Sequence, residues 1–118
     1  MATRIELYEP NPAYFAEATS PQFNTPTATT LSSGIDYVVS LNNGPVLLWF
    51  EKAVGDTGAT NIISFTDSFG RVADIAQTFT ATGIYTRKFQ RQGWADAAGD
   101  LNFNVEVDTV ITLIPIKL

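Results

Sequence analysis

The chain has 118 residues, of which 45% are hydrophobic and 16% charged, and its formal net charge is −5 at pH 7. This length suits one domain with a real hydrophobic core. Neither cysteine nor histidine occurs, which excludes disulfides, thiolate nucleophiles, the common zinc sites and Ser-His-Asp catalysis.

The charge and the apolar runs also limit the partners. A net negative field repels phosphates and anionic lipids, so we expect neither a nucleic-acid nor a membrane partner. The longest strictly apolar run is VLLWF, which is far too short to span a membrane. The beginning of the chain, MATRIELYEP, lacks the apolar stretch of a secretion signal. We expect a protein that is made and used without that export pathway.

Residues 1–27 are predicted to form an extended N-terminal arm. They hold four of the six prolines, which disfavour ladder pairing, and only TRIELY reads as a strand. One short helical turn is possible in NPAYFAEATS. The arm is nevertheless aromatic, with Tyr8, Tyr14, Phe15 and Phe23. A free tail is not usually so aromatic, so it should lie either on its own sandwich or on a neighbouring subunit.

Residues 28–118 predict an all-β sandwich or barrel. Thr, Val, Ile, Phe and Tyr dominate, turn residues recur about every ten positions, and no window keeps a helical period. The expected strands are, in chain order, 35–41, 45–52, 61–67, 72–81, 83–89, 101–107 and 109–118.

Three local patterns add detail to the strands. The turn NNG (42–44) predicts a hairpin between its flanking strands. PVLLWFEK is apolar on both faces, which indicates a central strand with Trp49 in the core. In the last strand, Pro115 and Lys117 are typical of a protected sheet edge.

The stretch YTRKFQRQGW (85–94) concentrates positive charge. It carries Arg87, Lys88 and Arg91, three of the seven cations, interleaved with aromatic side chains that include Trp94. Such a mixture suits a single-stranded nucleic-acid groove, but the net charge argues against it. The alternatives are an ion pair of Arg87 with a carboxylate of the same domain, or a contact with an acidic partner protein. Trp94 either caps the sandwich or anchors a contact.

Neither a catalytic centre nor a cofactor is predicted. No spacing marks a pair of catalytic carboxylates, and the usual nucleophile-and-base pairs are missing. The loops with Asp96 and Asp100, and with Asp56 and Asn61, contain oxygen ligands but do not match the twelve-residue calcium loop. We interpret these residues as turn formers.

From Asn43 onward the chain resembles the small capsid decoration (cement) proteins of tailed bacteriophages. The resemblance rests on NNGPVLLWFEK, FTDSFGRVADIAQTFTATGIY, FQRQGWADAAGDLNFNV and TVITLIPIKL, taken in order. It covers roughly the last 75 residues and leaves residues 1–27 unmatched.

This resemblance implies a jelly-roll-like β-sandwich of about eight strands that binds the outside of an icosahedral phage head. It also implies a homotrimer that clamps adjacent major capsid subunits, made in the host cytoplasm and located on the virion surface. The cations 87, 88 and 91 would then pair across a subunit boundary or with the capsid, and the arm aromatics would clasp a neighbour.

A second class of function remains open. Short β-sandwiches also serve in phage tails and fibres, where Trp94 and Tyr85 would form a platform for stacking a sugar. A glycan screen separates the two classes, because a cement protein should bind no sugar.

Overall fold

The computed structural model describes residues 2–10, 25–53, 61–106 and 111–118. Strands make up 52% of the described residues, and two sheets pack face to face as a sandwich, which confirms the predicted all-β class. The strands are β1 (Thr3–Arg4), β2 (Thr29–Thr30), β3 (Asp36–Ser40), β4 (Val46–Lys52), β5 (Asn61–Thr66), β6 (Ile75–Phe79), β7 (Gly83–Phe89), β8 (Asp100–Val105) and β9 (Ile111–Lys117). The one helical turn described, α1 (Arg91–Trp94), follows β7.

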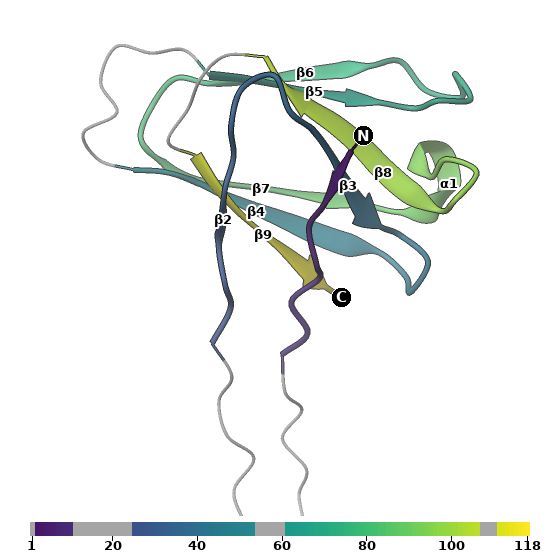
Figure 1. The fold of residues 1–118 in the computed structure, drawn as a ribbon, viewed down its shortest axis with the longest axis horizontal. Coiled ribbons are helices and arrows are strands. Elements are labelled where there is room, and N and C mark those ends of the chain that lie inside the picture. Colours follow the sequence, from purple (N-terminus) through teal and green to yellow (C-terminus); the bar gives the residue numbers. More distant parts are fainter. Residues whose placement is uncertain (1, 11–24, 54–60, 107–110) are drawn as a thin grey trace, which may run out of the picture.

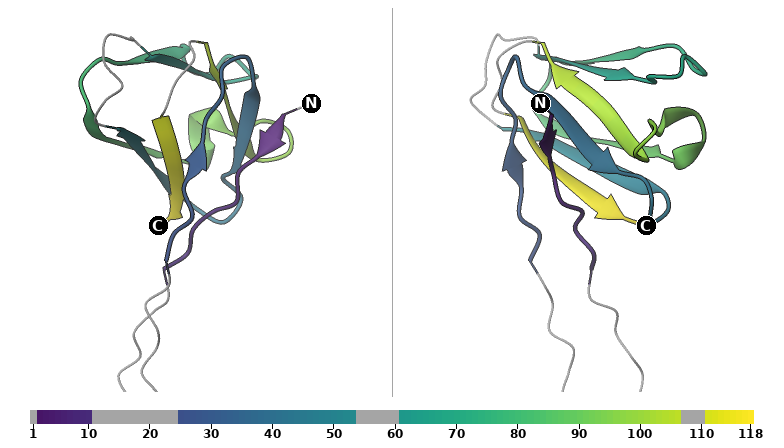
Figure 2. Two further views of the ribbon diagram at one scale, coloured as in Figure 1. Left: turned by 60° about the vertical axis from the view of Figure 1, so that its left-hand side comes forward. Right: turned by 45° about the vertical axis from the view of Figure 1, so that its right-hand side comes forward.

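The strands form a five-stranded sheet, β1-β3-β8-β5-β6, and a four-stranded sheet, β2-β9-β4-β7. All named pairs are antiparallel except β1 with β3. Figures 1 and 2 show the two layers, with β5 and β6 at one edge and α1 beside the start of β8. No helix in the described part of the chain is long and apolar enough to cross a membrane.

The core lies between the sheets and follows the period-two alternation of the strands. In β4 and β5 every second side chain is buried. Phe65 of one sheet stacks on Phe89 of the other, with ring centroids 5.0 Å apart, and also packs against Phe50 at 6.2 Å. Burying each such ring contributes roughly 1.5–3 kcal/mol. These contacts between large aromatic rings hold the layers together.

The turn at Asn42–Gly44 does not make the predicted hairpin. It carries the chain from β3 in one sheet to β4 in the other, so its flanking strands are not paired. Asn42 donates from Nδ2 to the carbonyl of Ala98, at 3.0 Å. Its side chain lies so close to Gly99, at φ +85°, that a Cβ there would collide with it. The contacts with the 96–100 loop, rather than strand pairing, hold this turn.

The last strand, β9, is not a sheet edge. It lies between β4 and β2, and Tyr8 forms a parallel bridge with Ile116. The Tyr8 amide donates to the Pro115 carbonyl at 2.7 Å, and the Lys117 amide donates to the Tyr8 carbonyl at 2.9 Å. Proline is tolerated because its missing N–H faces this short arm segment and not the β4 ladder. The edge-protection prediction is therefore wrong.

The described parts of the arm belong to the sandwich. β1 pairs with β3, and the Ile5 side chain is 5% exposed within the core. β2 adds to β9 in the other sheet. In Figures 1 and 2 the stretches 2–10 and 25–30 run beside each other towards the same end of the molecule. The arm was expected to lie either on its own sandwich or on a neighbouring subunit. Its described residues lie on their own sandwich.

Candidate functional site

The three clustered cations point in different directions. Arg87 lies on the inner-face side of β7, with its guanidinium 5.7 Å from the Phe89 ring centroid. Lys88, the next residue, belongs to the outer face, and Arg91 in α1 donates to Oδ1 of Asn42 at 3.2 Å. Among the described residues, no carboxylate forms an ion pair with any of the three. The predicted ion pair of Arg87 within its own domain is therefore not formed there.

Trp94 and Tyr85 are half-buried against core phenylalanines. The Trp94 ring meets Phe89 edge-on at 5.2 Å between centroids. Tyr85 meets Phe79 edge-on at 4.7 Å, and its hydroxyl donates to the Ala81 carbonyl at 2.6 Å. Trp94 thus caps the core, one of its two predicted roles.

Trp49 is not in the core as predicted. It is half-buried on the outer face of β4, because its neighbours Leu48 and Phe50 take the inward positions. Period-two alternation allows only one of two adjacent residues to face the core. The run VLLWF is apolar on both faces, so its composition did not show which residues point inward.

Trp49 belongs to an apolar outer face of the four-stranded sheet. Strand register places Trp49 between Thr86 and Ile114, and Leu47 between Lys88 and Ile116. Ile84, in the next row, is 55% exposed. We call the set Leu47, Trp49, Ile84, Ile114 and Ile116 the apolar face. The signal was visible in the sequence, since both β4 and β9 were read as apolar on both faces.

The outer face of the five-stranded sheet has the opposite character. Register aligns Val38 and Thr66 with Asn102 across β8, and Ser64 with Asn104. Asn104 also donates to the Asp36 carboxylate, at 2.6 Å. Amides and hydroxyls dominate this face, as expected for a sheet with one solvated side. The two outer faces therefore differ in chemistry.

A cleft of about 180 Å³ opens between the edge strands of the two sheets. Its apolar lining consists of Phe50, Phe65, Ile75, Phe79 and Tyr85. Arg87 and Gln77 supply the polar groups. A space of this size lies below the usual range for a drug-sized ligand, about 300–1,000 Å³, so it suits a single side chain.

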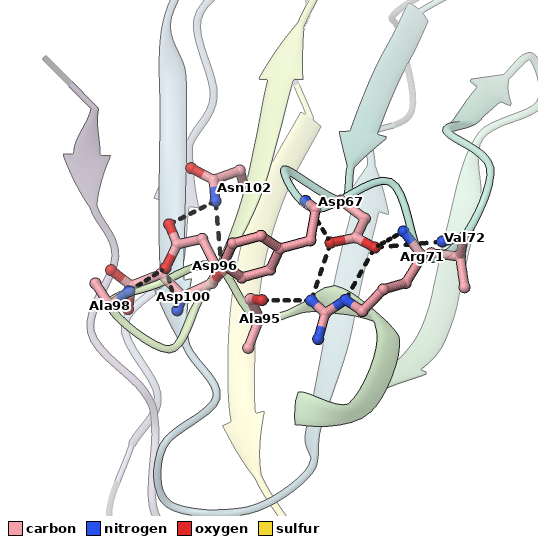
Figure 3. Close-up of polar contacts among 9 residues, drawn as sticks. Asp67, Arg71, Val72, Ala95, Asp96, Ala98, Asp100 and Asn102 are labelled. Carbon is pink, nitrogen blue, oxygen red and sulfur yellow. Dashed lines mark hydrogen bonds and ion pairs between the residues drawn. The ribbon is translucent and has the colours of Figure 1, made fainter.

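Asp67 organises the loop after β5. It accepts hydrogen bonds from the backbone amides of Phe69, Arg71 and Val72, at 3.1, 2.6 and 3.2 Å. Arg71 adds a two-pronged ion pair, and the same guanidinium bonds the Ala95 carbonyl beyond α1 (Figure 3). The Arg71 bonds, together with these amides, outweigh burial and hold the pKa of Asp67 well below its usual range.

Asp96 organises the second loop in Figure 3. It accepts from the amides of Ala98 and Asp100 at 2.8 and 2.9 Å, and from Nδ2 of Asn102 at 2.8 Å. Burial acts to raise the pKa of Asp96, but these donors outweigh it and lower the pKa. The Asp100 carboxylate accepts hydrogen bonds from Nη1 and Nη2 of Arg4, at 3.0 and 2.6 Å.

Asp96 acts as a turn former, as interpreted from the sequence. Asp100 does not, because it begins β8 and its carboxylate pairs with the distant Arg4. The oxygens of both acids already accept hydrogen bonds or an ion pair, and the described ranges contain no group of three or more acidic side chains that would hold a metal ion. Asp56 of the other calcium candidate lies outside the described residues.

The predicted arm contacts are only partly within the described structure. Tyr8 is half-buried and bridged to β9. Tyr14, Phe15 and Phe23, and the short turn expected near them, lie outside the described residues.

Comparisons with known proteins found no match among family models, curated proteins or solved structures. The resemblance to phage decoration proteins stays a prediction.

Proposed function

We propose that this chain is a structural binding protein of a virus particle. It decorates the outside of an icosahedral phage head as a homotrimer and stabilises contacts between major capsid subunits. On this proposal it is not an enzyme, uses no cofactor, and is carried on the virion surface after synthesis in the host cytoplasm.

The apolar face is the observation that carries the proposal. Leu47, Trp49 and Ile114 occupy outward positions where a solvated antiparallel sheet usually carries polar side chains. The polar face of the other sheet supplies the internal comparison. A contiguous apolar surface that is half-buried or exposed in the isolated chain fits a contact with another protein. We assign this face to the subunit contact of the trimer.

Topology supports the same proposal. Without β1, the sheet orders are β2-β9-β4-β7 and β3-β8-β5-β6, four strands each. Most consecutive strands lie in opposite sheets, as the two Greek keys of an eight-stranded jelly roll require. That is the architecture implied by the resemblance to decoration proteins.

The test is the mass of the purified chain in solution, measured by light scattering at micromolar concentration. The proposal expects a species near three times 12.8 kDa. The variant Trp49→Thr/Ile114→Thr should become monomeric while keeping its β-sheet circular dichroism. Ile62→Thr, which removes a half-buried apolar side chain on the outer face of the five-stranded sheet, is the matched control and should stay trimeric.

Capsid binding is tested next, by co-sedimentation with undecorated phage heads. Retention of the wild type and loss of the double variant support decoration. A wild-type chain that is monomeric and does not sediment with heads contradicts it.

The second candidate is a phage tail or fibre module that binds a carbohydrate or a protein receptor. Two half-buried aromatic side chains favour it: Tyr85, which lines the cleft, and Trp94, which packs on Phe89. A glycan array decides its carbohydrate form, because saturable binding that is lost in Tyr85→Ala would favour the tail module over cement.

A further inference from the structure

Strand β7 presents a long, open sheet edge. It is the terminal strand of the four-stranded sheet and pairs over seven residues with β4. Gly83 to Lys88 are exposed or half-buried. The edge strands on the opposite side, β1 and β2, are two residues each. The outward backbone N–H and C=O groups of an edge strand are free to pair with another chain.

The cleft runs along this edge. Tyr85, Thr86 and Arg87 of β7 form one wall, and Ile75, Gln77 and Phe79 of β6 form the other. A strand added to β7 would continue the four-stranded sheet past this opening. Its inward side chains would then face the aromatic lining of the cleft.

The charge of the edge is positive on an acidic protein. β7 carries Arg87 on the cleft side and Lys88 on the outer side, and none of its residues is acidic. Neither cation has an ion-pair partner among the described residues. Both remain available to carboxylates on an incoming chain.

We propose that β7 is a strand-addition site for an extended acidic segment of a partner protein. Backbone hydrogen bonds supply affinity along the edge, as in other strand-addition complexes. One bulky apolar side chain enters the cleft, and two consecutive carboxylates meet Arg87 and Lys88.

The register fixes the order of these groups in the partner. Residues directly opposite each other share a sheet face. An antiparallel strand would place its residues opposite Lys88, Arg87, Thr86 and Tyr85 in its own N-to-C order. From its N-terminal end, the partner segment therefore has an acidic residue opposite Lys88 and a second one opposite Arg87. Any residue can follow opposite Thr86, and a bulky apolar residue lies opposite Tyr85. The antiparallel direction continues the pairing pattern of this sheet.

A second copy of the chain does not fit this edge well. Antiparallel pairing of two β7 strands would bring a second Arg87 and Lys88 to the edge but no carboxylate, so neither cation would gain an ion-pair partner on the opposite strand. Nucleic acid offers no peptide backbone to the edge and is repelled by the net charge of −5. An acidic peptide satisfies both the edge and its charge.

The experiment measures fluorescence anisotropy of the labelled peptide Thr-Val-Glu-Glu-Thr-Phe-Thr-Val with the purified full chain. Saturable binding with Kd below about 1 mM is expected. Arg87→Glu/Lys88→Glu should weaken it at least about tenfold. Arg91→Glu, a charge reversal of the same kind just outside the strand, should change the Kd by less than about twofold.

Two further probes separate strand addition from simple charge attraction, and both use the wild-type protein. A peptide with N-methylated alternate amides should bind at least about tenfold more weakly, because its backbone cannot pair. A peptide with Gly in place of Phe should also bind more weakly, because the cleft stays empty.

Absence of binding at 1 mM peptide overturns the proposal. Equal binding of the N-methylated peptide also overturns it, as does tighter binding of labelled oligothymidylate with the same loss in the double variant. The inference does not rest on the capsid proposal, since the purified chain alone is tested.

Discussion

Single polar residues set the geometry of the loops around α1. Asp67 ties its own loop together and, through Arg71, bonds to the carbonyl of Ala95. Asp96 holds the turn that starts β8. Aspartate favours such turns because its short side chain reaches nearby backbone amides. The sequence indicated a turn at Asp96, but not that Arg71 links the two loops.

Asp67→Asn should lower the thermal midpoint by several degrees, because Arg71 loses its charged partner. The effect depends on pH. The folded-state pKa of Asp67 is depressed. The stability that its carboxylate contributes is therefore fully present above the unfolded pKa of about 3.9, and it is lost as the pH falls below that value.

The measurement is the melting temperature of both proteins between pH 7 and pH 2.5. The difference in melting temperature between the wild type and Asp67→Asn should become smaller below about pH 4. Asp74→Asn, an exposed change in the same loop, is the control and should have little effect. A gap independent of pH would show that the carboxylate charge does not stabilise the loop.

Lys52 shows what a local pattern cannot reveal. It ends β4 only 1% exposed, and Nζ donates to the carbonyls of Phe79 and Thr80 at 2.9 and 3.0 Å. A buried ammonium requires such partners. Those partners come from β6 and the residue after it, 27 and 28 positions away.

At the scale of elements, strand positions were predictable and strand pairing was not. The predicted strands all overlap observed ones, since alternation and β-branched residues are local signals. The SFGR turn joins a true hairpin, β5–β6, whereas NNG joins strands of different sheets. The partner of a strand depends on distant residues, such as the ones that contact Asn42.

The short N-terminal strand should matter for stability. Ile5→Ala should lower the free energy of unfolding by about 2–4 kcal/mol, because Ile5 is buried in the core. Glu6→Ala, an exposed change next to it, should cost less than about 0.5 kcal/mol. Urea unfolding measures both. Equal, small effects would mean that residues 2–10 do not fold with the sandwich.

At the scale of the whole molecule, the two outer faces and the arm suggest assembly. One sheet turns amides and hydroxyls outward, and the other turns Leu47, Trp49 and Ile114 outward. The radius of gyration is 15.6 Å, above the roughly 13 Å of a compact body of similar length. An extended shape provides more contact surface than a sphere would.

The prediction at this scale concerns the aromatic residues Tyr14, Phe15 and Phe23 of the arm. On the proposal of a trimeric decoration protein, the variant Tyr14→Ser/Phe15→Ser/Phe23→Ser should lose trimer formation, because it removes the aromatic side chains that are expected to contact a neighbouring subunit. Its circular dichroism spectrum should stay unchanged. Light scattering gives the mass. The control Thr19→Ala/Ser20→Ala/Gln22→Ala should remain trimeric, and a monomer there would show that the segment does not act through its aromatic residues.

The sequence by itself determined the all-β class, most strand positions and the turn-forming role of Asp96, because these follow from contacts between near neighbours in the chain. Only the tertiary structure decided that Trp49 faces outward, that β9 is internal and that Arg87 and Lys88 flank an open edge. Each of these depends on which strands pair and which face meets the core, and both are settled by packing between distant segments.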